Sequence, residues 1–89
     1  MKLHWASGAN ADLVEIFDHL IRENPNTASD VLDRIEEAAL PLLDHPRLGR
    51  PGRVAGTREL VVGEFPYVLP YCIQQDTIVV LRVLHSARK

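Results

Sequence analysis

The chain has 89 residues and a formal net charge of −2; 46% of its residues are hydrophobic and 25% are charged. This composition is typical of one small folded domain and excludes a disordered chain. The single cysteine, Cys72, excludes an intramolecular disulfide framework of the secreted type. The longest apolar run, residues 77–85, contains an arginine and is too short for a membrane-spanning helix. Because the N-terminus does not resemble a signal peptide, we expect a cytoplasmic protein without a membrane partner.

Residues 2–6 (KLHWA) alternate between apolar and polar side chains and predict a short strand. Ser7 is the expected N-cap of a first helix over residues 8–24, in which apolar residues recur at helical spacing. Asn24-Pro25 ends this helix, because the residue before a proline is disfavoured in helical conformation. A second helix should begin at Asn26 or Thr27, where Thr27 and Asp30 resemble a capping box. Its short connection to the first helix predicts an antiparallel helical hairpin.

Pro41 predicts a kink or a tightened last turn in the second helix. After this helix, the chain has the pattern of strands. Residues 58–62, 67–74 and 77–84 are rich in β-branched and aromatic residues, with turns at 63–66 and 75–76. Pro70 cannot donate a ladder hydrogen bond, so we expect a bulge or a locally unpaired edge there. The order β-α-α-β-β-β predicts an α+β domain with a helical hairpin on one face of a small, mostly antiparallel sheet.

An unequal distribution of charge accompanies this order. Residues 1–45 carry three basic and nine acidic residues, whereas residues 46–89 carry seven basic and three acidic residues. Residues 45–60 (HPRLGRPGRVAGTREL) concentrate this basic character in a segment rich in glycine and proline. Arginine is suited to bidentate contact with phosphate or carboxylate, so the segment is expected to be an anion-facing loop. No predicted helix is basic, which argues against direct sequence-specific DNA binding.

Two residues near the C-terminus are candidates for chemistry. Arg82 lies in an otherwise apolar strand and is costly to bury unpaired, so it should lie on the open sheet face or pair with a carboxylate such as Glu59. His85 is a candidate proton carrier or a hydrogen-bonded strand end. Arg53, Arg58 and Arg82 could stabilise a phosphorane in metal-independent ribonuclease chemistry, with Glu59 or His85 carrying protons. The histidines lack ligand spacing and the glycines fit no nucleotide-binding motif, so we expect no metal and no cofactor.

Three segments carry a resemblance to a known family: RPGRVAGTRELVV (50–62), YVLPYCI (67–73) and LRVLHSARK (81–89). Together with the element order, they resemble the ParE/RelE superfamily of toxins from type II toxin–antitoxin modules. The resemblance covers residues 1–89 as one domain. It implies a growth-inhibiting cytoplasmic toxin that is neutralised by a cognate antitoxin, whose C-terminal segment lies along the helical hairpin and the sheet.

Two activities divide this superfamily. RelE-like members cleave mRNA on the ribosome, whereas ParE-like members inhibit DNA gyrase without a known hydrolytic site. By position, Arg58, Arg82 and His85 match superfamily motif positions and would be the catalytic residues of a RelE-like enzyme. No aromatic residue follows His85, and lysine occurs only as Lys2 and Lys89. Both departures favour the ParE-like activity. A few family-typical residues are expected to be missing after Lys89.

The alternatives are a RelE-like endoribonuclease acting on ribosome and mRNA, and a non-toxic peptide-binding module. Residues expected to contact the target or the antitoxin are the basic segment's side chains and three apolar anchors of the helices: Arg47, Arg50, Arg53, Arg58, Glu59, Leu13, Phe17 and Ile35.

Overall fold

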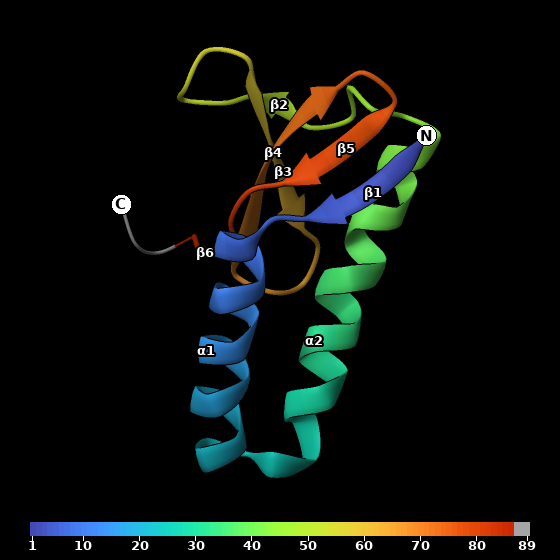
Figure 1. The fold of residues 1–89 in the computed structure, drawn as a ribbon. Helices are drawn as coiled ribbons and strands as arrows, with labels where there is room; N and C mark the ends of the chain where they lie inside the picture. Colours follow the sequence, from blue (N-terminus) through green and yellow to red (C-terminus); the bar gives the residue numbers. More distant parts are fainter. Residues whose placement is uncertain (87–89) are drawn as a thin grey trace.

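The computed structural model describes residues 1–86 of the chain; the expectations on residues 87–89, including Lys89, lie outside the described part. A helical hairpin packs against a twisted sheet (Figure 1). The elements are β1 (Lys2–Trp5), α1 (Ser7–Glu23), α2 (Pro25–Ala39), the 3₁₀ helix η1 (Leu40–Leu43), β2 (Arg50–Pro51), β3 (Thr57–Val62), β4 (Tyr67–Gln74), β5 (Thr77–Val80) and β6 (Leu84–His85). The strand order is β1-β5-β4-β3-β2, and β6 pairs with β4 beyond the end of β5. Only the β1–β5 pair of these described strands is parallel, so the predicted α+β class is confirmed.

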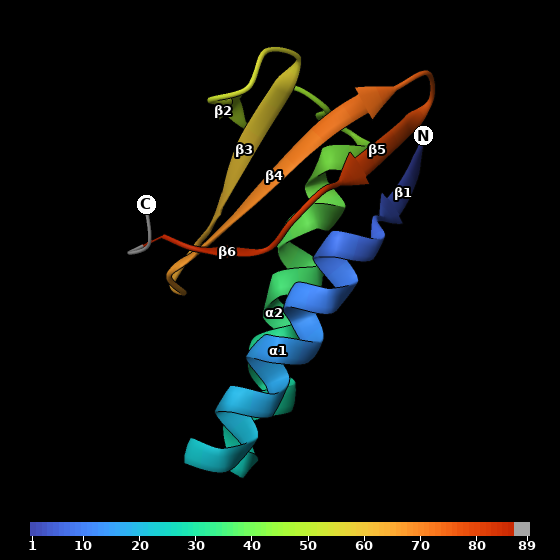
Figure 2. The ribbon, with the colours of Figure 1, turned by 60° about the vertical axis from the view of Figure 1, so that its left-hand side comes forward.

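The two helices are antiparallel and lie side by side, and the tip of the hairpin projects beyond the sheet (Figures 1 and 2). The helix boundaries differ slightly from those predicted. Ser7 is the first helical residue rather than the N-cap, and Ala6 precedes it without a side-chain cap. Pro25 opens α2 at a position where a missing N–H costs nothing.

The capping box predicted in α2 is wrong. The Thr27 hydroxyl donates to the carbonyl of Asn24, 3.2 Å away, and Asp30 is exposed. Helix initiation at Pro25 places Thr27 inside the first turn, where its hydroxyl donates back to a carbonyl instead of accepting a backbone N–H. The tightened turn predicted at Pro41 is confirmed, because residues 40–43 form η1.

The long last strand predicted over residues 77–84 is interrupted by a β-bulge. Tyr71 of β4 pairs with Val80, but Tyr67 pairs with His85, so four steps along β4 face five along the partner segment. The carbonyl of Pro70 accepts the N–H of Leu81 at 2.8 Å, but proline has no N–H to donate in return. The bulge predicted from Pro70 is therefore confirmed, and it re-aims the side chains of residues 82–85.

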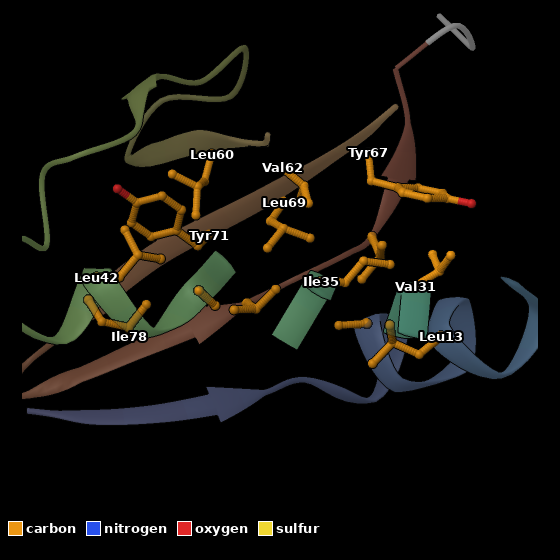
Figure 3. Packing of buried hydrophobic residues seen from close by; sticks show 14 residues of the cluster. Leu13, Val31, Ile35, Leu42, Leu60, Val62, Tyr67, Leu69, Tyr71 and Ile78 are labelled. Carbon is orange, nitrogen blue, oxygen red and sulfur yellow. The ribbon is translucent and has the colours of Figure 1, made fainter. Parts of the chain in front are cut away.

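The hydrophobic core lies between the helices and one face of the sheet. Alternate residues of β3, β4 and β5 point into it and meet α1, α2 and η1 (Figure 3). Its fully buried large side chains are Tyr71, Ile35, Leu42, Leu69, Ile78 and Val80. Within residues 1–86, no helix packs against the opposite face of the sheet (Figures 1 and 2).

Candidate functional site

The basic segment begins with a loop that is tied to the sheet by hydrogen bonds. The Tyr71 hydroxyl donates to the carbonyl of Pro46 at 2.7 Å and accepts the N–H of Gly49 at 2.9 Å. Arg58, opposite Tyr71 in the β3–β4 ladder, donates from Nη1 to the carbonyls of Arg47 and Gly49 at 3.2 and 2.6 Å. One cationic and one phenolic side chain therefore hold this loop against the sheet.

Glu59 organises the next part of the segment. Its Oε1 accepts from the Arg50 guanidinium, with contacts of 3.4 Å from Nε and 3.3 Å from Nη2. Its Oε2 accepts the backbone N–H of Arg53 at 3.4 Å. Since Arg50 and Glu59 are also directly paired in the β2–β3 ladder, Glu59 joins β2 and the following loop to the sheet.

A cleft of about 300 Å³ opens where β3 begins and β4 ends. Arg47 and Arg58 line it together with Pro51, Thr57, Cys72 and Ile73, and no carboxylate is among the lining residues. The lining of the cleft thus combines two arginines with polar and apolar side chains.

Arg82 pairs with Asp12 of α1 and not with Glu59, the partner suggested from the sequence. Arg82 donates from Nε and Nη2 to the Asp12 carboxylate at 2.7 and 3.0 Å, and the same carboxylate accepts the N–H of Val83 at 2.8 Å. Gly8 allows this approach, because a Cβ there would lie 3.1 Å from the Arg82 Cδ and from the carbonyl of Leu81. The bulge turns Arg82 from the sheet toward the first turns of α1, which places Asp12 within reach.

This pairing perturbs the acidity of both groups. Burial tends to raise the pKa of Asp12, but the hydrogen bonds from Arg82 and Val83 and the positive charge of Arg82 together lower it below its ordinary value of 3.8. The Asp12 carboxylate in turn raises the pKa of Arg82. Both groups are therefore held in their charged forms.

His85 lies on β6 against Tyr67. Their rings meet edge to face with centroids 5.6 Å apart and an interplanar angle of 83°. Burial raises the pKa of the Tyr67 phenol. His85 is half-buried and pairs through its backbone with Tyr67.

The candidate catalytic residues Arg58, Arg82 and His85 are not brought together. Arg58 faces Tyr71 and His85 faces Tyr67, positions four residues apart on β4 and so about 13 Å from each other. Arg82 is directed to α1 by its pair with Asp12. The sequence reasoning also missed Asp12, Tyr71 and Gly49, because only contacts distant in sequence give these residues their roles.

Two of the apolar anchors proposed for a partner are unavailable, which corrects that prediction. Leu13 and Ile35 are 8% and 0% exposed and belong to the core, because they lie on the helix stripe that meets the sheet. Phe17 is half-buried. The exposed apolar side chains of α1 are instead Val14 and Ile21, 62% and 41% exposed. With Phe17 they follow the spacing of one helix face.

The centre of the uncovered sheet face is also apolar. Its central positions are Val61, Val68, Pro70, Cys72 and Val79, which occupy alternate places in the paired strands. The paired residues of this face also include Lys2 and His4 of β1 at one edge, and Arg50 and Glu59 toward the other. Single-stranded RNA is normally bound by a positive groove lined with aromatic stacking side chains. The paired residues of this face include no Phe, Tyr or Trp, and its arginine, Arg50, is in an ion pair with Glu59.

Solved structures define the class of protein. The chain superimposes on a protein of the chromosomal ParDE toxin–antitoxin system from P. aeruginosa with a TM-score of 0.88 and 32% identity, over 96% of this chain and 95% of that chain. The match to a chain of the toxin–antitoxin complex RelBE2 from Mycobacterium tuberculosis has a TM-score of 0.64 and 29% identity, over 94% and 95%. The fold is that of the ParE/RelE toxin superfamily, as the sequence segments predicted.

A family model narrows this class. The model described as the ParE toxin of the type II toxin–antitoxin system, parDE, matches residues 3–89. The chain therefore belongs to the ParE family of type II toxin–antitoxin toxins. Among curated relatives, protein Y4kP of Sinorhizobium fredii is 38% identical over 96% of this chain and 88% of the relative. Toxin RelE2 of Caulobacter vibrioides is 36% identical over 94% of this chain and 93% of the relative.

No helix within residues 1–86 is long and apolar enough to cross a membrane. In the same part of the chain, no three His, Cys, Asp or Glu side chains gather in a group that could hold a metal ion.

Proposed function

We propose that this toxin acts by binding and inhibiting DNA gyrase, without hydrolytic chemistry, and that a cognate antitoxin neutralises it. The observation that carries the proposal is the separation of Arg58, Arg82 and His85. General acid–base catalysis requires its groups within hydrogen-bonding reach of one reacting site. Arg58 is engaged with loop carbonyls and Arg82 with Asp12, so both guanidinium groups have structural partners.

Two further observations favour gyrase over the ribosome. The centre of the open sheet face is apolar and its Arg50 is paired with Glu59, so this face offers little to an RNA backbone, which is bound mainly through positive charge. The superposition on the ParDE protein is also closer than that on the RelBE2 protein. The alternative, a RelE-like mRNA endoribonuclease, is retained because curated relatives carry RelE names.

The test compares two activities of the chain freed from its antitoxin. Plasmid supercoiling by gyrase is measured in one reaction, and cleavage of mRNA on programmed ribosomes in the other. We expect loss of supercoiling with intact mRNA. Cut mRNA with normal supercoiling would overturn the proposal in favour of the endoribonuclease, and two unaffected reactions would favour a non-toxic binding module.

The antitoxin is proposed to dock on the exposed face of α1 formed by Val14, Phe17 and Ile21. An apolar segment that orders on binding commonly recognises such a face through residues at helical spacing. Ile21→Glu should weaken antitoxin binding at least about tenfold, since a charge would be buried in an apolar contact. Leu40→Glu, a similar change at a residue 52% exposed in η1, is the matched control. Equal antitoxin affinity of both variants would contradict this docking site.

A further inference from the structure

The cleft at the start of β3 has the features of a prepared anion site. Its lining residues include Pro51 of β2, the start of β3 and the end of β4. This end of the sheet lies away from the tip of the helical hairpin (Figure 2). Arg47 and Arg58 supply two guanidinium groups, and neither forms an ion pair with a carboxylate of residues 1–86. Positive charge in this cleft is therefore left uncompensated by the described part of the chain.

The position of one of these guanidinium groups is set in advance. Arg58 uses Nη1 to bind the carbonyls of Arg47 and Gly49, and its Nε and Nη2 donate to no other group of the described residues. The loop that supplies these carbonyls is itself held by Tyr71. A donor fixed in this way binds an anion without losing much further conformational freedom.

The Arg47 side chain supplies the second guanidinium group of the cleft. Only its carbonyl takes part in holding the loop, and its side chain is exposed. Arginine side chains bind carboxylates and phosphates with paired, charge-assisted hydrogen bonds. The charge and the donors of the cleft therefore suit an oxyanion.

We infer that the cleft between Arg47 and Arg58 binds a carboxylate side chain of an acidic protein segment. Pro51, Cys72 and Ile73 form apolar walls that fit the methylene groups of such a segment and its neighbouring residues. No aromatic side chain lines the cleft for base stacking. Residues 1–45 carry a formal charge of −6, which repels a nucleic-acid polyanion more strongly than a single carboxylate.

The inference rests on the proposed function, because a toxin that acts by binding needs a specific contact with a partner protein. The carboxylate belongs either to gyrase or to the antitoxin, and the chemistry of recognition is the same for both. If the carboxylate belongs to the antitoxin, the cleft is occupied in the toxin–antitoxin complex. If it belongs to gyrase, the cleft is open in that complex.

The test is an NMR titration of the ¹⁵N-labelled full chain. One probe is a blocked peptide with a glutamate between two leucines, the second is the same peptide with glutamine, and the third is inorganic phosphate. We expect the glutamate peptide to shift the amides of Thr57, Cys72 and Ile73, and the glutamine peptide to leave them unchanged. Equal responses to both peptides, or a response to phosphate at lower concentration than to the glutamate peptide, would overturn the inference.

Arginine variants test whether the two guanidinium groups of the cleft bind the peptide. Arg47→Gln should weaken binding of the glutamate peptide about tenfold, because it removes charge-assisted bonds but leaves the Arg47 carbonyl in place. Arg22→Gln, on the exposed end of α1, is the matched control and should bind as the wild type does. Arg58→Lys keeps the charge but loses the planar guanidinium group that can make paired hydrogen bonds, so it should also bind the glutamate peptide more weakly. Equal binding by the Arg47 and Arg22 variants would contradict the site.

The same titration on the toxin–antitoxin complex identifies the source. Cleft amides that no longer respond to the glutamate peptide indicate a carboxylate from the antitoxin, whereas a retained response indicates one from gyrase. The supercoiling assay separates the two proposals. A chain that inhibits gyrase without binding the peptide refutes the carboxylate site alone, and a chain that binds the peptide but leaves supercoiling intact refutes the gyrase proposal alone.

Discussion

Gly49 shows how a single residue sets the geometry of the basic loop. A Cβ at this position would lie 2.7 Å from the carbonyl oxygen of Glu59 and 2.7 Å from Cε1 of Tyr71. Glycine therefore lets the loop approach the sheet closely enough for the Tyr71 and Arg58 hydrogen bonds to form. The local sequence cannot reveal this need, because both atoms that would be displaced come from other strands.

We predict that Gly49→Ala destabilises the domain by about 2–3 kcal/mol, because the backbone must move to accommodate the methyl group. Urea unfolding of the purified chain measures this change. Gly63→Ala is the matched control, since a Cβ there meets nothing within 4 Å, and it should leave the free energy of unfolding nearly unchanged. Similar midpoints for the two variants would show that Gly49 is not under steric pressure.

Asp12 is a second residue whose role depends on distant parts of the chain. It compensates the charge of Arg82 and accepts the Val83 N–H, which the bulge leaves without a strand partner. Its pKa is lower in the folded chain than the ordinary value of 3.8. The stabilisation from its ionised form is therefore complete above pH 3.8 and is lost as the pH falls through the lower, folded-state pKa.

The predicted consequence is a pH-dependent difference between the wild type and Asp12→Asn. The wild type should be more stable at neutral pH, and the difference in unfolding free energy should stay constant down to about pH 5. Below pH 3.8 the difference should shrink, because Asp12 becomes protonated in the unfolded chain first and in the folded chain later. Chemical denaturation of both proteins at several pH values measures the difference in unfolding free energy. A difference that does not shrink below pH 3.8 would contradict the role assigned to Asp12.

At the scale of elements, two local irregularities could be predicted from single residues. Pro70 predicted the bulge and Pro41 predicted the tightened turn, because proline lacks the N–H that a regular ladder or helix requires. The β4–β5 turn was also predicted at residues 75–76, but its backbone strain was not. Gln75 has a φ of 56°, a conformation that non-glycine residues seldom adopt.

Replacement of Gln75 by glycine should relieve this strain. We expect Gln75→Gly to raise the free energy of unfolding by about 0.5–1 kcal/mol, since the left-handed conformation costs glycine little. Gln75→Ala retains a Cβ and should give no such gain. Thermal unfolding of both variants is the measurement, and equal stabilities would show that the turn relaxes without cost.

The whole molecule is a small domain that exposes apolar side chains on its surface. Its core lies on one face of the sheet, while Val14 and Ile21 on α1 and several valines on the open sheet face remain in contact with water. A chain of 89 residues buries a limited core, so burial of these surfaces by a partner should add substantially to its stability.

This leads to a prediction for the complex with the antitoxin. A partner that binds only the folded toxin stabilises it by about 4 kcal/mol at a concentration of 1,000 times Kd. The thermal midpoint of the toxin should therefore rise in the complex and depend on antitoxin concentration. Scanning calorimetry of the free chain and of the complex checks this, and coincident midpoints would show that the antitoxin does not favour the folded toxin.

Much of the candidate site could not be predicted from the sequence, and the reason differs from residue to residue. The arginines of residues 47–58 were visible as a basic segment, since composition alone reveals them. Arg58 was expected to be free for a partner, but its Nη1 is bonded to the loop carbonyls. Leu13 and Ile35 were expected to contact a partner, because helical spacing defines an apolar stripe without showing whether the sheet or a partner covers it.

The sequence by itself determined the fold class, the order of the main helices and strands, the superfamily and the position of the basic segment; the short strand β2 was not predicted. These depend on local periodicity, on proline and glycine, and on motifs that the chain carries in linear form. Only the tertiary structure decided which charges are neutralised and which remain available. Asp12 reaches Arg82 and Tyr71 reaches Gly49 across long separations in sequence, and such contacts exist only after the helices and strands have packed.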